Sequence, residues 1–221
     1  CDRKKCRYIP NGIHYENFSK VPPKKENGFI DIGAVLRISP IKDVKTLLYA
    51  FSQLKERVPN ARLHIAGPAD DEEYAQECYD LQEQLGTEDV RFLGTVNTLE
   101  YLEKFDFTVL CSISEGLPLA VLESFAAGRP CVVTDVGCCR QLINGMKEDD
   151  LGVAGICVPP MYREALCDAL EWMCTHPRER YQMGVTAKKR VEKFYRHEDM
   201  IRNYQQVYDE VFRRWQELDS A

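Results

Sequence analysis

Short apolar runs rich in β-branched residues alternate with helix-like periods along most of this chain. Strands are predicted at residues 29–35, 62–66, 90–93, 107–110, 131–134 and 155–158. Between strands, apolar residues recur at the spacing of a buried helix face, as in Val44, Leu47, Leu48, Phe51 and Leu54 and in Leu166, Ala169, Leu170 and Met173. The alternation predicts an α/β fold, a Rossmann-like parallel sheet of about six strands with helices on both faces.

The two ends of the chain depart from this pattern. Residues 1–27 are loop-like and are predicted to be a linker or entry segment, and residues 28–176 to be the Rossmann-like domain. Residues 177–221 contain two long helical segments with no strand between them. Packing on its own domain and covering a neighbouring domain explain the stripe of the last helix equally well. That stripe consists of Ile201, Tyr204, Tyr208, Val211, Phe212 and Trp215.

The composition is that of an ordinary globular protein. Of the 221 residues 44% are hydrophobic and 29% charged, and the formal net charge is −6. These values argue against disorder and against a nucleic-acid-binding surface. No apolar run approaches the ~18 residues of a membrane span, and residues 1–6 do not resemble a signal peptide. The first residue is not methionine, and we expect the sequence to be cut from a longer protein.

Ten cysteines are the main oddity of the composition. Six lie in apolar stretches and indicate small core residues in a reducing cytoplasm: Cys78, Cys111, Cys131, Cys157, Cys167 and Cys174. There is no Cys-x-x-Cys pair and the four histidines are scattered, so no metal site is expected. The vicinal Cys138 and Cys139 are either a redox pair or two thiols in a tight turn.

The loop after the predicted strand 29–35 contains two cations. Lys42 comes directly before a helix expected to begin near Asp43, which is a plausible N-cap. A cation at this end of a helix is mildly unfavourable unless an anion lies there too. Arg37 lies on the same loop. The pair is therefore either a clamp for phosphate oxygens or a pair of solvated surface charges.

Two further loops place a glycine at a strand end. Gly67 follows the predicted strand 62–66, and Gly94 and Thr95 follow Phe92 and Leu93 of the strand 90–93. Ligands of open parallel sheets bind at the carboxyl ends of the strands, and glycine lets a ligand approach the backbone closely. A tight turn needs glycine for the same reason. Backbone groups of these loops could line the site of a nucleotide base.

Glu123 lies on an otherwise apolar stretch between Pro118 and Gly128. A helix this apolar should be buried on nearly every side, and burying a carboxylate without a partner is costly. Two explanations stay open. Glu123 either pairs inside the protein with Arg129 or Arg140, or it faces a pocket and accepts hydrogen bonds from a ligand such as a ribose diol.

The turn before this helix offers further ligand groups. Pro118 is expected at the first helical position with Gly116 before it, which leaves the backbone amides of residues 116–119 free at a helix N-terminus. Such amides suit a phosphate or a sugar hydroxyl. Glu115 just ahead either complements the helix dipole or belongs to the same site.

No Gly-x-Gly-x-x-Gly, Walker or nucleophile-elbow motif is present, which disfavours dinucleotide oxidoreductases, P-loop hydrolases and Ser-His-Asp enzymes. Several pieces of the sequence, taken in their order, resemble the nucleotide-binding half of the GT-B glycosyltransferases of family four. These pieces are Arg37 and Lys42, the Gly67 loop, residues 92–94, the pair Glu115 and Glu123, and residues 134–137. The resemblance covers nearly the whole chain. Residues 39–46, 135–142 and 150–160 resemble the PelF-type branch, the cytoplasmic transferase of bacterial Pel exopolysaccharide synthesis.

The resemblance implies a retaining transferase whose donor is a nucleoside diphosphate sugar, with a uridine diphosphate sugar such as UDP-glucose favoured. Arg37, Lys42 and Glu115 are implied as catalytic residues, the two cations holding the diphosphate without a metal and Glu115 orienting the sugar. Glu123 would bind the ribose. The other implied donor-binding residues are Gly67, Phe92, Leu93, Gly94, Thr95, Gly116, Leu117, Pro118 and Leu119. Cys138 and Cys139 depart from the glycine-rich turn that is commoner in the family.

A GT-B enzyme closes two Rossmann-like domains over its donor, and this sequence resembles only the second. We therefore expect an N-terminal acceptor domain as a partner, with residues 177–221 packing on the present domain and crossing to the other one. The fragment alone is expected to bind donor with little or no transfer. Membrane polysaccharide synthase subunits are further possible partners, and nucleic acid is not. A noncatalytic nucleotide-binding or scaffold module on the same fold is the alternative.

Overall fold

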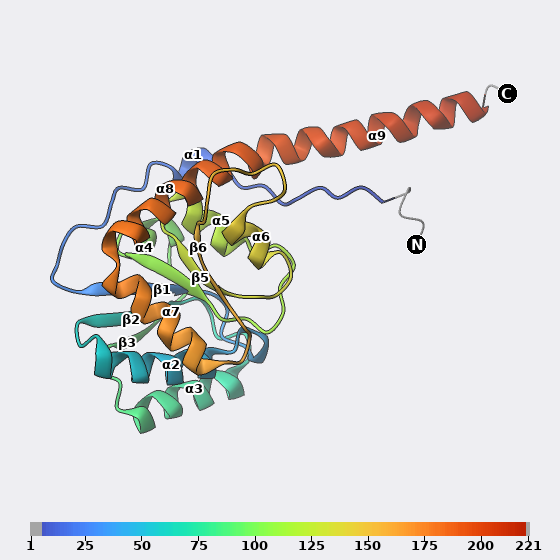
Figure 1. Cartoon of the computed structure of the whole chain (residues 1–221). Helices are drawn as coiled ribbons and strands as arrows, with labels where there is room; N and C mark the ends of the chain where they lie inside the picture. Colours follow the sequence, from blue (N-terminus) through green and yellow to red (C-terminus); the bar gives the residue numbers. More distant parts are fainter. Residues whose placement is uncertain (1–5, 220–221) are drawn as a thin grey trace.

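A computed structural model describes residues 6–219 and shows a six-stranded parallel sheet in the order β3-β2-β1-β4-β5-β6 (Figure 1). The predicted strands are confirmed to within one residue at every end. The strands are β1 (Ile30–Val35), β2 (Ala61–Ala66), β3 (Val90–Gly94), β4 (Phe107–Leu110), β5 (Cys131–Thr134) and β6 (Gly155–Val158). The sheet grows outward from β1 to β3 and then returns to β4. The loops after β1 and β4 therefore diverge at a topological switch point, where open sheets bind ligands.

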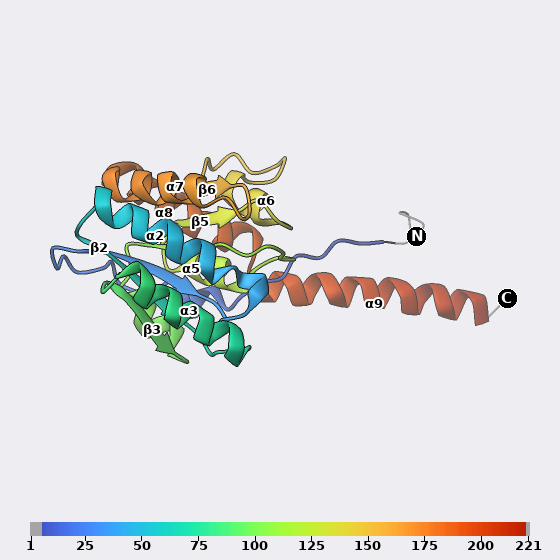
Figure 2. The same cartoon turned by 90° about the horizontal axis from the view of Figure 1, so that it is seen from below.

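Helices cover both faces of this sheet, which confirms the expected α/β architecture (Figure 2). One face carries α2 (Val44–Arg57), α3 (Glu72–Leu85) and α7 (Arg163–Thr175). The other face carries α5 (Leu119–Ala126), α6 (Cys139–Asn144) and α8 (Pro177–Phe194). Three short helical segments, α1 (Tyr15–Phe18), the 3-10 turn η2 (Pro40–Lys42) and α4 (Thr98–Leu102), lie in the connections.

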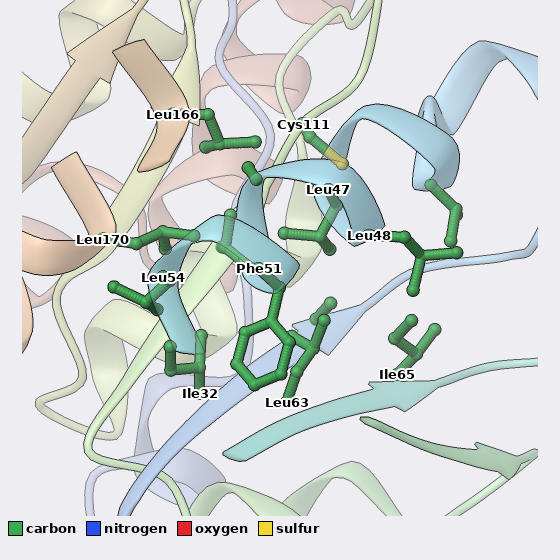
Figure 3. Packing of buried hydrophobic residues seen from close by; sticks show 14 of the residues in the cluster. Ile32, Leu47, Leu48, Phe51, Leu54, Leu63, Ile65, Cys111, Leu166 and Leu170 are labelled. Carbon is green, nitrogen blue, oxygen red and sulfur yellow. The ribbon is translucent and has the colours of Figure 1, made fainter. Parts of the chain in front are cut away.

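The apolar stripe of α2 is the centre of the larger core. Phe51 is fully buried and points from α2 toward Ile32 and Leu63 of the sheet, while Leu166 and Leu170 approach from α7 (Figure 3). Both helix stripes predicted from the sequence are buried in this way. Their burial fixes α2 against β1, and so it fixes the loop between them.

The start of α2 differs from a normal capped helix. Asp43 occupies the N-cap position, as expected, but its backbone is left-handed (φ 49°, ψ 45°) and its side chain makes no capping hydrogen bond. Its Oδ2 is buried without a hydrogen-bond partner among the described residues. Burial raises the pKa of this carboxyl. A left-handed backbone is uncommon outside glycine, although aspartate adopts it more readily than most residues, and at Asp43 it ends the loop that carries Lys42.

A network of four charged groups ties the entry segment to the amino end of the sheet. Lys24 Nζ lies 2.8 Å from Asp31 Oδ2 and 2.6 Å from Asp106 Oδ2. Arg180 of α8 adds a contact of 3.2 Å to Asp106 Oδ1. A partly buried network of this kind is costly to break because it leaves an unpaired charge. Residues before β1 are thereby held against the domain on the side opposite to the strand carboxyl ends.

The last helix, α9 (His197–Asp219), extends away from the body of the domain (Figures 1 and 2). Its start is anchored by a backbone bridge between Ile13 and Arg196, the residue just before the helix. Further along, Arg7 Nη1 lies 2.9 Å from Glu210 Oε1. The stripe from Ile201 to Trp215 is exposed at every position named above, by 40% to 70%. Within residues 6–219, the helices fall short of the length and apolarity that crossing a membrane requires.

Candidate functional site

The loops that follow β1 and β4 are held together by backbone contacts at the switch point. The amide of Ile113 donates to the carbonyl of Ile41 at 2.8 Å. The thiol of Cys111 lies 3.0 Å from the carbonyl of Lys42. Because the β4 end is itself part of the sheet, these contacts give the Lys42 loop a fixed position before any ligand binds.

The loop after β5 is fixed to the loop after β4 in the same way. Thr134 Oγ1 donates to the carbonyl of Ser112 at 2.6 Å, and the amide of Cys138 donates to the carbonyl of Gly116 at 2.9 Å. Gly137 has a φ of +53°, and a Cβ there would lie 2.1 Å from the carbonyl oxygen of Glu115. Glycine is needed at 137 because a side chain would push the two loops apart.

Lys42 and Glu115 meet across the switch point, although 73 residues separate them. Lys42 Nζ lies 2.5 Å from Glu115 Oε1, and the Ser112 hydroxyl donates to the same oxygen at 2.6 Å. The side chains of Lys42 and Glu115 are only 17% and 11% exposed. The structure therefore brings together one predicted cation and one predicted carboxylate in a mostly desolvated contact, where electrostatic interactions are stronger than in water.

Arg37 pairs with Asp70 and not with Glu115. Its Nη1 lies 2.7 Å from Asp70 Oδ2, and its side chain is 59% exposed. Such an exposed pair is weak, so a ligand anion can displace it at little cost. Arg37 instead borders a pocket of about 240 Å³. The residues of this pocket are Val35, Leu36, Arg37, Ala66, Gly67, Pro68, Thr95, Val96 and Thr98.

Gly67 is required by the closeness of two strand ends. With its φ of +150°, a Cβ at 67 would lie 1.8 Å from the carbonyl oxygen of Leu36. The amide of Gly67 donates to the carbonyl of Gly94 at 2.8 Å. The pocket thus contains Gly67 and Thr95 of the predicted set. Phe92 packs edge-on against Tyr79 of α3, with ring centroids 4.7 Å apart, so its ring belongs to the α3 face.

Helix α5 begins one residue later than expected. Pro118 is the N-cap with φ −73° and ψ 119°, and Leu119 is the first helical residue, so the predicted position of Pro118 is wrong by one. Proline restrains the turn before the helix because its φ is fixed. The amides of the first turn still lack intrahelical partners. The entry segment supports this turn, since Asn11 Nδ2 donates to the carbonyl of Leu117 at 3.3 Å.

The carboxylate of Glu123 has no ion-pair or hydrogen-bond partner among the described residues, and burial raises the pKa of this half-buried group. The two arginines that the sequence offered as partners are engaged elsewhere. Arg129 donates to the carbonyls of Leu102 and Pro22, and Arg140 forms a two-pronged ion pair with Asp135. Internal pairing is therefore excluded as the explanation for Glu123. A desolvated carboxylate without a partner is a candidate ligand group.

Sequence reasoning missed Ser112, and it assigned no role to Thr134 or Asn11. The only signal for the hydroxyls of Ser112 and Thr134 was a small polar residue at the end of an apolar strand.

The vicinal thiols differ from each other. Cys139 is fully buried in the core, while Cys138 is half-buried with its Sγ 3.8 Å from the Tyr8 hydroxyl. Both are free thiols. A larger hollow of about 720 Å³ lies along α7 and α8, and none of the predicted site residues lines it.

Replacing Gly137 by alanine tests whether the two loops are tightly packed. We expect the variant to lose about 1–3 kcal/mol of unfolding free energy, since the new Cβ is both strained and obstructed. That loss corresponds to roughly 2–4 °C of melting temperature per kcal/mol. Gly116→Ala is the matched control because a Cβ there meets no atom within 4 Å. Equal melting temperatures for the two variants would contradict the packing described here.

Comparison with known families shows the family of this chain. The model described as "Glycosyl transferases group 1" matches residues 16–190. The chain is 31% identical over 148 residues to the putative glycosyltransferase EpsF of Bacillus subtilis. It is 37% identical over 101 residues to the O-antigen biosynthesis glycosyltransferase WbnH of Escherichia coli. These matches cover 61% and 42% of this chain, and 37% and 28% of the two relatives. The chain belongs to the group 1 glycosyl transferases.

Solved structures show the same fold at low sequence identity. A glycosyltransferase from Rickettsia africae superposes with a TM-score of 0.85 at 18% identity, over 96% of this chain and 58% of that one. Anabaena HepE in complex with UDP-glucose superposes with a TM-score of 0.80 at 17% identity, over 92% of this chain and 57% of that one. The fold is therefore that of one Rossmann-like half of a GT-B glycosyltransferase. In each case about half of the larger enzyme is matched.

Proposed function

We propose that this domain binds the donor of a glycosyltransferase that transfers a sugar from a nucleoside diphosphate sugar. The observation that carries the proposal is the set of charged groups at one sheet edge. Lys42 and Glu115 meet there in a mostly desolvated contact, and Glu123 offers a half-buried carboxylate without a partner. A diphosphate supplies the anion that Lys42 suits, and a ribose diol supplies two donors for Glu123.

Each part of the donor has a chemically suitable counterpart in this proposal. Lys42, joined by Arg37 once it leaves Asp70, holds the diphosphate and stabilises the charge that grows on the leaving group. These cations supply the positive charge, so no metal ion is part of the proposal. Glu115 and the amides at the start of α5 orient the sugar. The pocket between Arg37, Gly67 and Thr95 receives the base.

We further propose a uridine diphosphate sugar, with UDP-glucose as the first candidate, a retaining reaction and a role in exopolysaccharide synthesis. The likeness of residues 39–46 and 150–160 to the PelF-type branch supports this choice. So does the fold shared with HepE, whose structure is a complex with UDP-glucose. The relative WbnH is an O-antigen biosynthesis glycosyltransferase, which also fits a role in building a bacterial surface glycan. The proposed location is the cytoplasm, with membrane polysaccharide synthase subunits as partners.

The acceptor side of the reaction is proposed to lie on a second domain. The chain spans 37% and 28% of the lengths of EpsF and WbnH. The exposed stripe of α9 is a suitable surface for such a domain, since an apolar face of this size is costly in water. We therefore expect the isolated chain to bind donor and to show little or no sugar transfer.

A thermal-shift panel of uridine, guanosine and adenosine diphosphates and their glucose conjugates tests the proposal. At a concentration of 100 times Kd, a ligand stabilises the folded state by about 2.7 kcal/mol. For a chain of this size that is a shift of roughly 5–10 °C. We expect selective shifts with the uridine compounds. If none of the compounds shifts the melting temperature, and calorimetry also shows no binding, donor binding is overturned. If a complete two-domain protein binds the donor but transfers no sugar, the scaffold alternative is favoured.

A further inference from the structure

The hydroxyl of Ser112 connects two parts of the site that the proposed function treats separately. Ser112 follows β4 and is completely buried. Its hydroxyl donates to Glu115 Oε1 at 2.6 Å, and its carbonyl accepts from Thr134 Oγ1 at 2.6 Å. Thr134 is itself only 2% exposed. A buried pair of hydroxyl contacts therefore leads from the end of β5 to the carboxylate of Glu115.

The two carboxylate oxygens of Glu115 differ in their hydrogen-bond partners. Oε1 accepts from both Lys42 Nζ and Ser112 Oγ. Oε2 has no hydrogen-bond partner among the described residues. The carboxylate is thus held through one oxygen, and the other oxygen is available to a donor group on a ligand. A sugar hydroxyl is such a donor.

Binding of a diphosphate changes the partners of Glu115. Phosphate oxygens compete for Lys42, which is the only cation on Glu115 within residues 6–219. With a bare nucleoside diphosphate, Glu115 then keeps only the Ser112 hydroxyl as a protein donor, and losing a charged hydrogen bond is costly for a carboxylate 11% exposed. A donor that carries a sugar provides a hydroxyl for that oxygen.

We propose that Ser112 is a positioning residue that makes this site prefer a nucleoside diphosphate sugar to the bare nucleoside diphosphate. Resting on the proposed function, the inference adds the residue that sets this preference. Ser112 keeps Glu115 aligned while Lys42 engages phosphate, so that Oε2 meets the sugar. Without the Ser112 hydroxyl, Glu115 is free to follow Lys42 and the contact to the sugar is lost. The preference for the nucleoside diphosphate sugar over the bare nucleoside diphosphate then disappears.

The test compares the Kd of UDP with the Kd of UDP-glucose by calorimetry in the wild-type chain and in Ser112→Ala. The ratio of interest is the Kd of UDP divided by the Kd of UDP-glucose. We expect this ratio to fall about tenfold in Ser112→Ala, mainly because UDP-glucose binds more weakly, while the Kd of UDP changes less than about threefold. Ser112→Cys retains a weak donor in the same place and is expected to restore part of the ratio.

Ser124→Ala is the matched control. Ser124 is also buried, 1% exposed, and it makes two contacts, at 2.6 Å to Thr108 Oγ1 and at 3.0 Å to the carbonyl of Arg129. It therefore loses similar hydrogen bonds without touching Glu115. We expect Ser124→Ala to lower the melting temperature and to leave the ratio of Kd values as in the wild type.

The possible failures are separable. Wild-type protein that binds neither UDP nor UDP-glucose contradicts the proposed donor. Wild-type protein that binds both with equal Kd, or a Ser112→Ala ratio equal to that of Ser124→Ala, overturns the role of Ser112. Thr134→Val keeps the side-chain volume and removes only the contact to the Ser112 carbonyl. If Ser112→Ala does not fold, a drop of about threefold in the ratio for Thr134→Val supports the inference, and an unchanged ratio overturns it.

Discussion

Replacing Lys42 by methionine is expected to weaken binding of a nucleoside diphosphate by roughly 100-fold, since charge-assisted hydrogen bonds to phosphate are the strong ones. The side chain is only 17% exposed, so water replaces little of the lost interaction. The same change leaves Glu115 with the Ser112 hydroxyl as its single donor. We therefore also expect a loss of about 1–3 kcal/mol of unfolding free energy. Titration calorimetry and chemical denaturation measure the two effects.

Lys45→Met is the control for this experiment. Lys45 lies three residues further on, and its Nζ pairs with Glu77 Oε2 at 2.6 Å on the exposed side of α2. The Lys45→Met variant removes the same charge from the start of α2, just after the Lys42 loop, but the Lys45–Glu77 pair is solvated and contributes little. Its nucleotide affinity should match the wild type. A similar fall in both variants would mean that only the net charge matters, and no fall in Lys42→Met would place the diphosphate elsewhere.

The centre of the sheet could be predicted from the sequence because strands β4 and β5 are buried on both faces. Runs such as residues 107–110 and 131–134 are wholly apolar or β-branched, and both are buried at all four positions. Long helices with a clear stripe, such as α2, were equally predictable. The short helix α6, with six residues, is too brief to show a period. The network around Lys24 was missed because Asp106, which joins Lys24 to Arg180, lies 82 residues from Lys24 in the chain.

The candidate site was only partly predictable. That Lys42 and Glu115 lie at one edge follows from the parallel sheet, since the carboxyl ends of all strands share it. Their direct contact, and the pairing of Arg37 with Asp70, depend on side-chain directions that no spacing reveals. Ser112 was missed for the same reason. A buried hydroxyl at a strand end is common, and only its distance to Glu115 gives it a role.

Replacing Glu123 by glutamine should weaken nucleotide binding without lowering the stability of the fold. The half-buried carboxylate lacks a partner, so its removal should leave the unfolding free energy unchanged or raise it by up to about 1 kcal/mol. Nucleotide binding should fall by roughly 10-fold or more, because a charged acceptor for the ribose hydroxyls is lost. A variant that is less stable than the wild type would show that Glu123 has a structural partner after all.

The pH dependence of stability gives a second test of Glu123. Burial raises the pKa of its carboxyl above the ordinary value of 4.5, so the unfolded chain loses this proton at lower pH than the folded one. Between the two pKa values the folded state binds more protons, and the unfolding free energy therefore falls as pH rises through that window. Glu123→Gln should remove this part of the slope. Glu83→Gln changes an exposed glutamate of α3 and is the control, which should retain this part of the slope.

Nucleotide saturation should also reduce the slope in the wild type, because ribose hydroxyls stabilise the charged carboxylate of Glu123. An identical slope in the wild type and in Glu123→Gln would show that this carboxyl is not desolvated, and the argument for a ribose contact would fail with it.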